Sequence, residues 1–310
     1  MTAPAPAAAP VQARPARPES RWAVAWAAIR PRTLGLAVTP VLLGSAIAWS
    51  EGAAAHWPSL LLALACALLI QIGTNVHNDV ADFRRGTDGG SRIGPLRVTA
   101  AGWVRPQTME RASFACFGLA LLLGVALVQR GGWPILVAGL ASLVAGWAYS
   151  GGPRPISHGA WGEFFVWIFF GLVAVAGSHW LQAGVASHAA WLAGAALGAP
   201  AAAVLLVNNH RDLEDDLRSG RRTLAARLGP AATLRAYALL MLLLPPLPVL
   251  WMAAQGRPGA LVSLAAGWPA WRLLRRLASQ PPGPWLNLQL AATARTASLF
   301  GLLLAAGVLL

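Results

Sequence analysis

The apolar runs of this chain recur at the length of a membrane-spanning helix, and that length most constrains its fold. A helix needs about 20 apolar residues to cross a bilayer, whereas the strands of a membrane barrel give alternating segments of about ten. Of the 310 residues, 56% are hydrophobic and 11% are charged. A soluble domain has about 25% charged residues, so that class is excluded. The pattern predicts an all-α polytopic membrane protein.

We predict nine transmembrane helices, arranged as two four-helix halves with a ninth helix appended. The predicted spans cover residues 33–50, 58–78, 111–129, 133–150, 162–181, 189–208, 234–254, 260–277 and 291–310. The two halves are inferred from topology. The second span and the sixth span are each the second helix of a four-helix half, and each is followed by a similar acidic stretch. Related halves of this kind usually place a shared site at their interface.

The basic residues predict the orientation. All 24 are arginines, and with a cytoplasmic N-terminus only Arg130 and Arg257 fall on the outer side. This asymmetry is the positive-inside pattern, and it places the longer polar connections, and any active site, toward the cytoplasm. Topology and attraction to the lipid bilayer explain the formal charge of +13, so we expect no nucleic-acid partner. Residues 1–20 are rich in alanine and proline and predict a disordered cytoplasmic tail.

The acidic residues gather in two short stretches. Seven of the eleven are Asp79, Asp82, Asp88, Asp212, Glu214, Asp215 and Asp216. Helical spacing puts Asn75, Asp79 and Asp82 on one face, beside Asn78, and it does the same for Asn208, Asp212 and Asp216. One such stretch alone is also explained as a solvated helix end with surface ion pairs worth about 0–1 kcal/mol. Two at equivalent positions indicate bound cations, because gathered carboxylates otherwise repel.

Carboxylate and amide oxygens suit a hard divalent ion. Mg²⁺ commonly binds through one or two carboxylates together with substrate phosphates. Both stretches also carry arginines, which match phosphate oxygens: Arg84, Arg85, Arg92, Arg97, Arg211, Arg218, Arg221 and Arg222. For any single arginine the positive-inside pattern remains an alternative explanation. In a membrane, an isoprenoid diphosphate is the candidate donor, with metal and arginine neutralising the charge that develops on its leaving group.

Two quoted motifs carry a family resemblance. The stretches "NVHNDVADFRRGTD" and "NNHRDLEDDLRSGRRTLAARLG" resemble those of the UbiA superfamily of intramembrane aromatic prenyltransferases, and within it the MenA branch, the 1,4-dihydroxy-2-naphthoate polyprenyltransferases. The likeness runs from about Arg30 to the C-terminus. It implies a UbiA-like transmembrane domain over residues 21–310, with its helices around a central cavity, in the bacterial cytoplasmic (inner) membrane.

The resemblance also implies roles for particular residues. Those expected at the reaction centre are Asp79, Asp82, Asp212, Asp216 and Tyr149, with the four aspartates and Asn75 as Mg²⁺ ligands. Those expected to bind substrate are Arg30, Asn75, Asn78, Arg84, Arg97, Arg154, Arg211, Arg221 and Arg222, with Arg30 or Arg154 on the acceptor's carboxylate. Arg221 departs from the lysine usual at its position, which keeps the charge but alters the donor geometry.

The implied reaction is prenyl transfer from a polyprenyl diphosphate to 1,4-dihydroxy-2-naphthoate, with loss of CO₂ and diphosphate, giving demethylmenaquinol. Other aromatic acceptors, 4-hydroxybenzoate or homogentisate, remain alternatives within the superfamily. An ion-coupled transporter is a more distant alternative, because it predicts charges at the bilayer midplane. In this sequence they gather at the ends of predicted spans, which favours headgroup chemistry.

Overall fold

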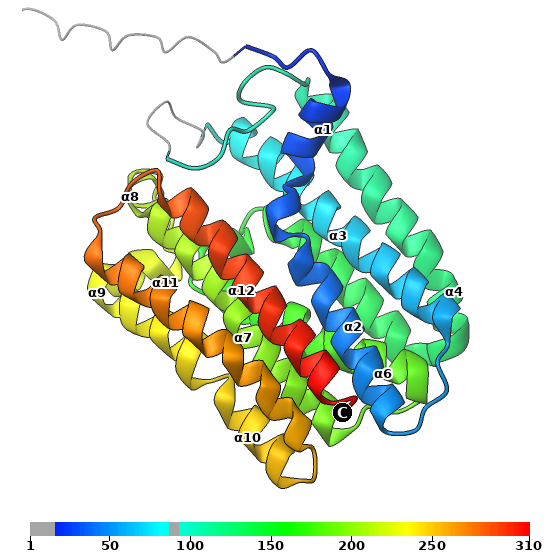
Figure 1. Cartoon of the computed structure of the whole chain (residues 1–310). Helices are drawn as coiled ribbons and strands as arrows, with labels where there is room; N and C mark the ends of the chain where they lie inside the picture. The colour runs from blue at the N-terminus through cyan, green and yellow to red at the C-terminus, as the bar shows by residue number, and fades with distance from the viewer. Residues whose placement is uncertain (1–15, 87–92) are drawn as a thin grey trace, which may run out of the picture.

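The computed structural model describes residues 16–86 and 93–310, and every regular element in that part of the chain is helical (Figure 1). Asp88, Arg92 and most of the predicted tail lie outside the described residues. The helices of the first half are α1 (Arg21–Ile29), η1 (Pro31–Thr33), α2 (Gly35–Ser50), α3 (Trp57–Arg84), α4 (Pro106–Ala148), η2 (Ile156–His158), α5 (Gly162–Val166), η3 (Trp167–Val173) and α6 (Ala174–Ala183). Those of the second half are α7 (His188–Arg211), α8 (Leu213–Arg218), α9 (Leu224–Ala238), η4 (Leu239–Leu243), α10 (Pro246–Ala254), η5 (Pro258–Ala266), α11 (Gly267–Ser279) and α12 (Leu286–Gly307).

Six of the described helices are long and apolar enough to cross a membrane, or seven if the bent pair Arg21–Thr33 and Gly35–Ser50 forms one span. The multi-pass helical architecture is therefore confirmed, whereas the count of nine stays a prediction. Two features account for the difference. Helix α4 covers two predicted spans in 43 residues and is kinked at Gly132, whose φ is 67°. Helix α11 has only 13 residues and carries three arginines.

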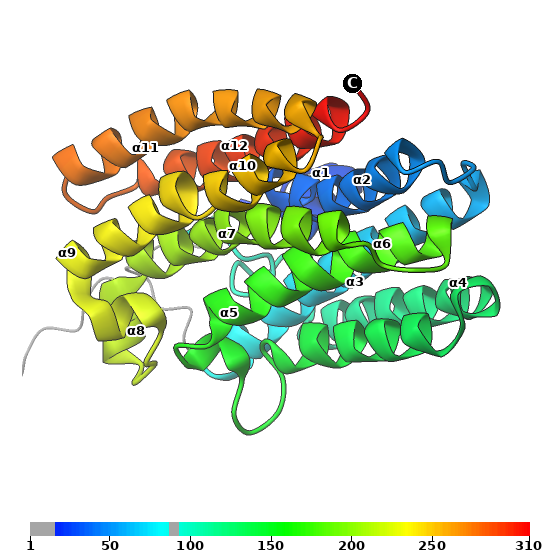
Figure 2. The same cartoon turned by 90° about the horizontal axis from the view of Figure 1, so that it is seen from below.

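Helix α7 lies in the middle of the bundle, between α10–α12 on one side and α3–α6 on the other (Figure 2). Its apolar stretch is 78% buried, the largest share among the six spans. The sequence explains this position, because α7 is built largely from alanine and glycine, and small side chains let neighbouring backbones approach closely. Gly194 and Gly198 of α7 meet Gly171 of η3 in this way. The helix that leads into the second acidic stretch is thus fixed at the centre.

We expect the substitution Gly171→Ala to destabilise the bundle by about 1–3 kcal/mol, as overpacking typically does. A Cβ at Gly171 would lie 2.4 Å from the carbonyl oxygen of Gly194 and 2.7 Å from the Cα of Gly198. The matched control is Gly177→Ala in α6, where a Cβ would meet open space. Melting temperatures in detergent should fall for Gly171→Ala and hold or rise for Gly177→Ala. Equal values for both variants would contradict the close approach.

Helix α3 positions the first acidic stretch. It continues to Arg84, six residues past the predicted span 58–78, so that Asn75, Asp79 and Asp82 all lie on regular helix. The chain then returns across α3 before α4 begins at Pro106. The C-terminal end of α3 and the short helix α8 lie at the same end of the bundle (Figure 1). The two acidic stretches therefore share one end of the molecule.

Candidate active site

Asp79 holds the segment that returns across α3. Its side chain is 2% exposed, and its two carboxylate oxygens accept hydrogen bonds from the backbone N–H groups of Val98 (3.1 Å) and Thr99 (3.0 Å). A carboxylate that accepts two backbone hydrogen bonds is held in a fixed orientation and keeps lone pairs for a further ligand. These two hydrogen bonds anchor the segment that contains Arg97, and they thereby hold Arg97 at the end of α3.

Asp82, one turn further along α3, lies between two arginines. Oδ2 pairs with Nη2 of Arg97, and Oδ1 accepts a hydrogen bond of 2.5 Å from Nη2 of Arg221. Arg97 also donates to the backbone carbonyl oxygen of Asn78 at 2.8 Å. All of these groups are largely removed from solvent. A buried charge is tolerated only when it is paired and hydrogen-bonded, and this arrangement meets that condition.

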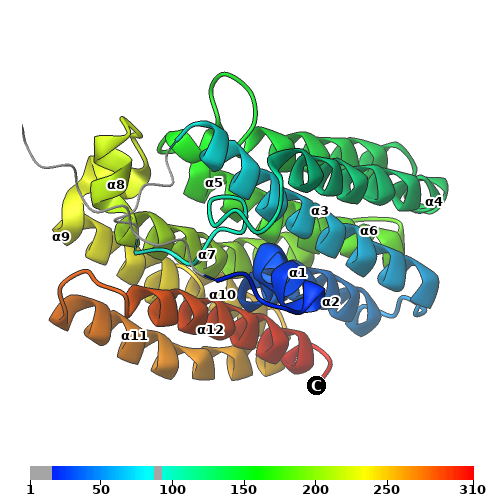
Figure 3. The same cartoon turned by 90° about the horizontal axis from the view of Figure 1, so that it is seen from above.

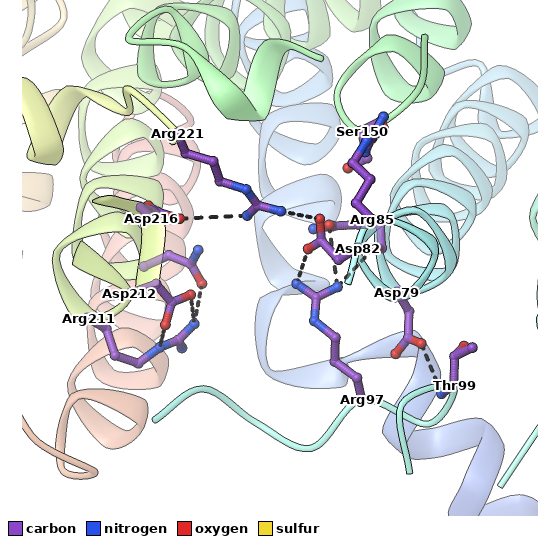
Figure 4. A network of polar contacts seen from close by, with 12 residues as sticks. Asp79, Asp82, Arg85, Arg97, Thr99, Ser150, Arg211, Asp212, Asp216 and Arg221 are labelled. Atoms are coloured by element: carbon purple, nitrogen blue, oxygen red, sulfur yellow. Dashed lines mark hydrogen bonds and ion pairs between the residues drawn. The ribbon is translucent and has the colours of Figure 1, made fainter. Parts of the chain in front are cut away.

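Arg221 joins the two acidic stretches. Nη2 contacts Asp82 of α3, which lies 139 positions earlier in the sequence than Arg221, and Nη1 lies 3.6 Å from Oδ1 of Asp216 in α8. One guanidinium therefore bridges α3 and α8 (Figure 4). The hydroxyl of Thr223 donates to Oδ2 of Asp216 at 3.2 Å. Burial raises the pKa of Asp216 to about 6, and the nearby Arg221 opposes that shift. A cation at this position therefore favours the ionised carboxylate.

Asp212 is bound by its neighbour Arg211. Nε and Nη2 of Arg211 each lie 2.7 Å from a carboxylate oxygen of Asp212, in the two-pronged geometry that suits a guanidinium. Arg211 also donates to Oδ1 of Asn208 at 2.9 Å and to Oδ1 of Asn287 at 3.1 Å. Asn287 in turn donates to the carbonyl oxygen of Ile93 at 2.7 Å. Helix α12 is thereby tied to both acidic stretches.

Asn287 is a site residue that local sequence patterns did not predict. It is one of two amides, with Gln289, in the stretch "WLNLQL" at the start of the last apolar run. Polar side chains at that place were the available signal, but the partner Arg211 lies 76 residues earlier in the chain.

Several predicted substrate-binding residues lie apart from the bridged carboxylates. Arg84 donates from Nη1 and Nη2 to the two carboxylate oxygens of Glu110 in α4, at 2.7 and 2.6 Å, and its side chain is half exposed. Arg154 and Arg222 are exposed. Asn75 donates from its amide nitrogen to the carbonyl oxygen of Ile29 at 3.0 Å, which ties α3 to α1. The structure thus brings Asp82, Asp216, Arg97 and Arg221 together, and it places Arg84 on a separate surface pair.

Tyr149 directly precedes Ser150, whose carbonyl oxygen accepts a hydrogen bond of 2.7 Å from Arg85 at the end of α3. Burial raises the pKa of the Tyr149 hydroxyl, the carboxylates of Glu163 and Asp82 raise it further, and Arg221 and Arg30 lower it.

Glu163 is 4% exposed, and its Oε1 accepts a hydrogen bond of 2.9 Å from Asn209. Its Oε2 has no partner among the described residues. A buried carboxylate oxygen of this kind costs free energy, which a ligand carrying a hydrogen-bond donor would recover. The sequence alone did not distinguish this role, because the helix dipole by itself favours an acid in the first turn of a helix.

The donor set fits a metal ion that arrives with its substrate. Among the described residues, no group of three His, Cys, Asp or Glu side chains could hold a metal ion. Pairs of carboxylates are present, and Asp82 and Asp216 share one cationic group, the guanidinium of Arg221. Mg²⁺ usually takes one or two carboxylates and completes its shell with phosphate oxygens and water. The hard oxygen ligands of this site are suited to such binding.

A multi-pass helical bundle that gathers carboxylates and arginines at one end is the arrangement expected of an intramembrane transferase that acts on a diphosphate. Comparison with family models then narrows this class, since the model described as the UbiA prenyltransferase family matches residues 37–308. The chain belongs to the UbiA prenyltransferase family.

Curated relatives and solved structures agree with this assignment. The chain is 38% identical over 209 residues to the 1,4-dihydroxy-2-naphthoate octaprenyltransferase of Mycobacterium tuberculosis, covering 67% of this chain and 70% of that protein. It is 31% identical over 302 residues to the protein of the same name from Bacillus subtilis, covering 94% of each. A UbiA homologue from Aeropyrum pernix K1 has a TM-score of 0.65 at 14% identity, covering 87% of this chain and 96% of that one. A homologue from Archaeoglobus fulgidus, bound to DMAPP and Mg²⁺, has a TM-score of 0.56 at 16% identity, covering 92% and 98%.

Proposed function

We propose that the protein transfers a polyprenyl group from a polyprenyl diphosphate to 1,4-dihydroxy-2-naphthoate in an Mg²⁺-dependent reaction that releases diphosphate and CO₂ and gives demethylmenaquinol. The observation that carries the proposal is the contact of Arg221 with both Asp82 and Asp216, because it joins the two acidic stretches in one charged site. The names of the bacterial relatives support the choice of acceptor.

On this proposal, the arginines bind the donor's diphosphate. Arg97 and Arg221 reach the same carboxylate from two directions, so a phosphate entering between them meets two guanidinium forks. Asp79, Asp82, Asp212 and Asp216 would hold Mg²⁺, which when bound neutralises negative charge on the leaving diphosphate. The preorganised arginines lower the barrier to breaking the allylic C–O bond for the same reason.

The acceptor would lie beside Tyr149 and Glu163. Oε2 of Glu163, which has no partner among the described residues, would accept a hydrogen bond from a ring hydroxyl, and the Tyr149 hydroxyl would orient the ring. Arg30 or Arg154 would bind the acceptor's carboxylate. The ring carbon that bears the carboxylate forms the new C–C bond as the donor's C–O bond breaks, and the electron pair of the lost C–CO₂ bond restores the aromatic ring. The transfer needs no net proton.

The same proposal includes the position in the cell. The relatives named 1,4-dihydroxy-2-naphthoate octaprenyltransferase are bacterial, so we place the protein in the cytoplasmic (inner) membrane, with a cytoplasmic N-terminus and the site end of the bundle toward the cytoplasm. The arginine asymmetry supports this orientation, since basic residues are retained on the cytoplasmic side. The proposed domain covers residues 21–310 as nine spans around a central cavity, after a tail over residues 1–20.

The test is an acceptor comparison at a fixed polyprenyl diphosphate. We expect purified protein with Mg²⁺ to release diphosphate and CO₂ and to form a prenylated naphthoquinol from dihydroxynaphthoate, because that acceptor presents a carboxylate to arginine and hydroxyls to Glu163. Mass spectrometry of the product and labelled CO₂ report the reaction, and chelation of the metal should stop it. Consumption of 4-hydroxybenzoate or homogentisate in its place would move the assignment to another acceptor. No turnover with any of the three would favour the transporter alternative.

A further inference from the structure

Helices α11 and α12 run side by side along one side of the bundle (Figures 1 and 3). An open groove of about 520 Å³ lies between them. Three arginines line it, Arg272 and Arg276 from α11 and Arg295 from α12, together with the hydroxyl-bearing Thr296. All three arginines are exposed, so their charges are available to a ligand that enters from outside.

The described part of the chain supplies no carboxylate to these arginines. Residues 217–310 contain no aspartate or glutamate, and among the described residues none of the three guanidinium groups makes an ion pair. Arg276 lies over the ring of Trp285, 5.4 Å from its centroid, which orients the side chain without neutralising it. Arginine within a membrane-embedded helix is expensive and normally pairs with an anion. An anion from outside the chain would supply that counter-charge.

The groove combines a cluster of arginines with apolar side chains, which suits the headgroup and the acyl chain of an anionic lipid. Arg272 and Arg276 are one turn apart on α11, and Arg295 faces them from the tenth residue of α12. Arg276 and Arg295 lie in the half of their helices nearer the connection 280–285, and Arg272 lies near the middle of α11. The lining also contains the apolar side chains of Leu273 and Leu299. A phosphate among the arginines would thus have apolar side chains near it for an acyl chain.

We propose that this groove is a binding site for a phospholipid with a net negative headgroup. A zwitterionic lipid would bring its own cation beside three arginines, with no carboxylate near to receive it. Basic pockets between membrane helices are known to recognise anionic headgroups by this electrostatic principle. The site is separate from the one that carries the proposed transfer reaction, and it rests on none of that reaction's residues.

The experiment measures lipid binding by native mass spectrometry on the full-length protein in a neutral detergent. Phosphatidylglycerol and phosphatidylcholine with identical acyl chains are titrated separately. The test variant is R272Q/R295Q, and the matched control is R227Q/R235Q, which removes the same charge from exposed positions on α9 outside the groove. The variant R272K/R295K retains the charge and guards against a loss of binding caused by misfolding.

We expect phosphatidylglycerol to bind more tightly than phosphatidylcholine, and R272Q/R295Q to weaken it about 30-fold, since each basic residue near an anionic headgroup contributes about fivefold. The control R227Q/R235Q and the variant R272K/R295K should retain tight binding. Equal affinity for the two lipids, or wild-type binding by R272Q/R295Q, would overturn the proposal. Displacement of the lipid by inorganic phosphate alone would also overturn it, because the groove would then recognise a free anion. Binding is read without turnover, so the result is independent of the acceptor assay.

Discussion

Replacing Arg221 with glutamine is expected to lower kcat/KM about 10²- to 10³-fold, the usual cost of removing one preorganised charge from a leaving group. Arg221 is the side chain that contacts both Asp82 and Asp216, so its loss removes the phosphate-binding fork and leaves the two carboxylates without their shared cation. Like carboxylates brought together without a cation repel each other. Steady-state diphosphate release by the purified variant measures the effect.

Two further variants make this test specific. Arg235→Gln removes an equal charge from an exposed position on α9 and should keep kcat/KM close to that of the wild type. Arg221→Lys keeps the charge but loses the planar fork, so it should recover part of the activity. If Arg221→Gln and Arg235→Gln have the same kcat/KM, the guanidinium bridge has no role in turnover.

The substitution Asp82→Asn is expected to abolish detectable turnover and to lower the melting temperature. Asp82 is buried and pairs with Arg97 and Arg221, and removing one member of a buried ion pair typically costs about 3–5 kcal/mol because the remaining charges stay uncompensated. We also expect Mg²⁺ added with inorganic diphosphate to raise the melting temperature of the wild type but not of the variant. Scanning fluorimetry in detergent and the diphosphate assay give both results.

The matched control is Asp215→Asn. Asp215 belongs to the same acidic stretch and carries the same charge, but it is partly exposed and pairs with Arg218 on the outside of α8 at 3.4 Å. Surface pairs of this kind contribute about 0–1 kcal/mol, so activity, melting temperature and the response to Mg²⁺ with diphosphate should all stay near wild type. Wild-type turnover in Asp82→Asn would remove the argument for metal binding at this carboxylate.

The sequence predicted the parts of the site that depend on local periodicity. Helical spacing put Asp79 and Asp82 on one face, and α3 carries both as regular helix. Repetition of an acidic stretch after a second apolar run predicted that two remote segments would meet, and Arg221 is where they do. The composition was sufficient to predict a helical membrane protein, because only helices and closed barrels satisfy the backbone within a bilayer.

The sequence did not predict which partner each polar group would take. Local spacing gave no sign that Asp79 would accept two backbone hydrogen bonds, from Val98 and Thr99. Nor did it predict that Arg84 would pair with Glu110 of α4, which is brought near because α3 and α4 pack along their lengths. Such pairings depend on tertiary neighbours that lie many residues away. Local spacing therefore predicts which residues share a face, and the packing of helices selects their contacts.

The bridge made by Arg221 has a consequence for the order in which ligands enter. Free Mg²⁺ must compete with a guanidinium that already neutralises Asp82 and Asp216, and displacing that guanidinium gives up both of these ion pairs. A metal ion that arrives with a diphosphate brings the anion that the released arginine needs. Binding of the two is then mutually reinforcing, and this reciprocity holds whichever ligand is added first. The protein without substrate would thus bind free divalent cations weakly, and their affinity would rise once a prenyl diphosphate is bound.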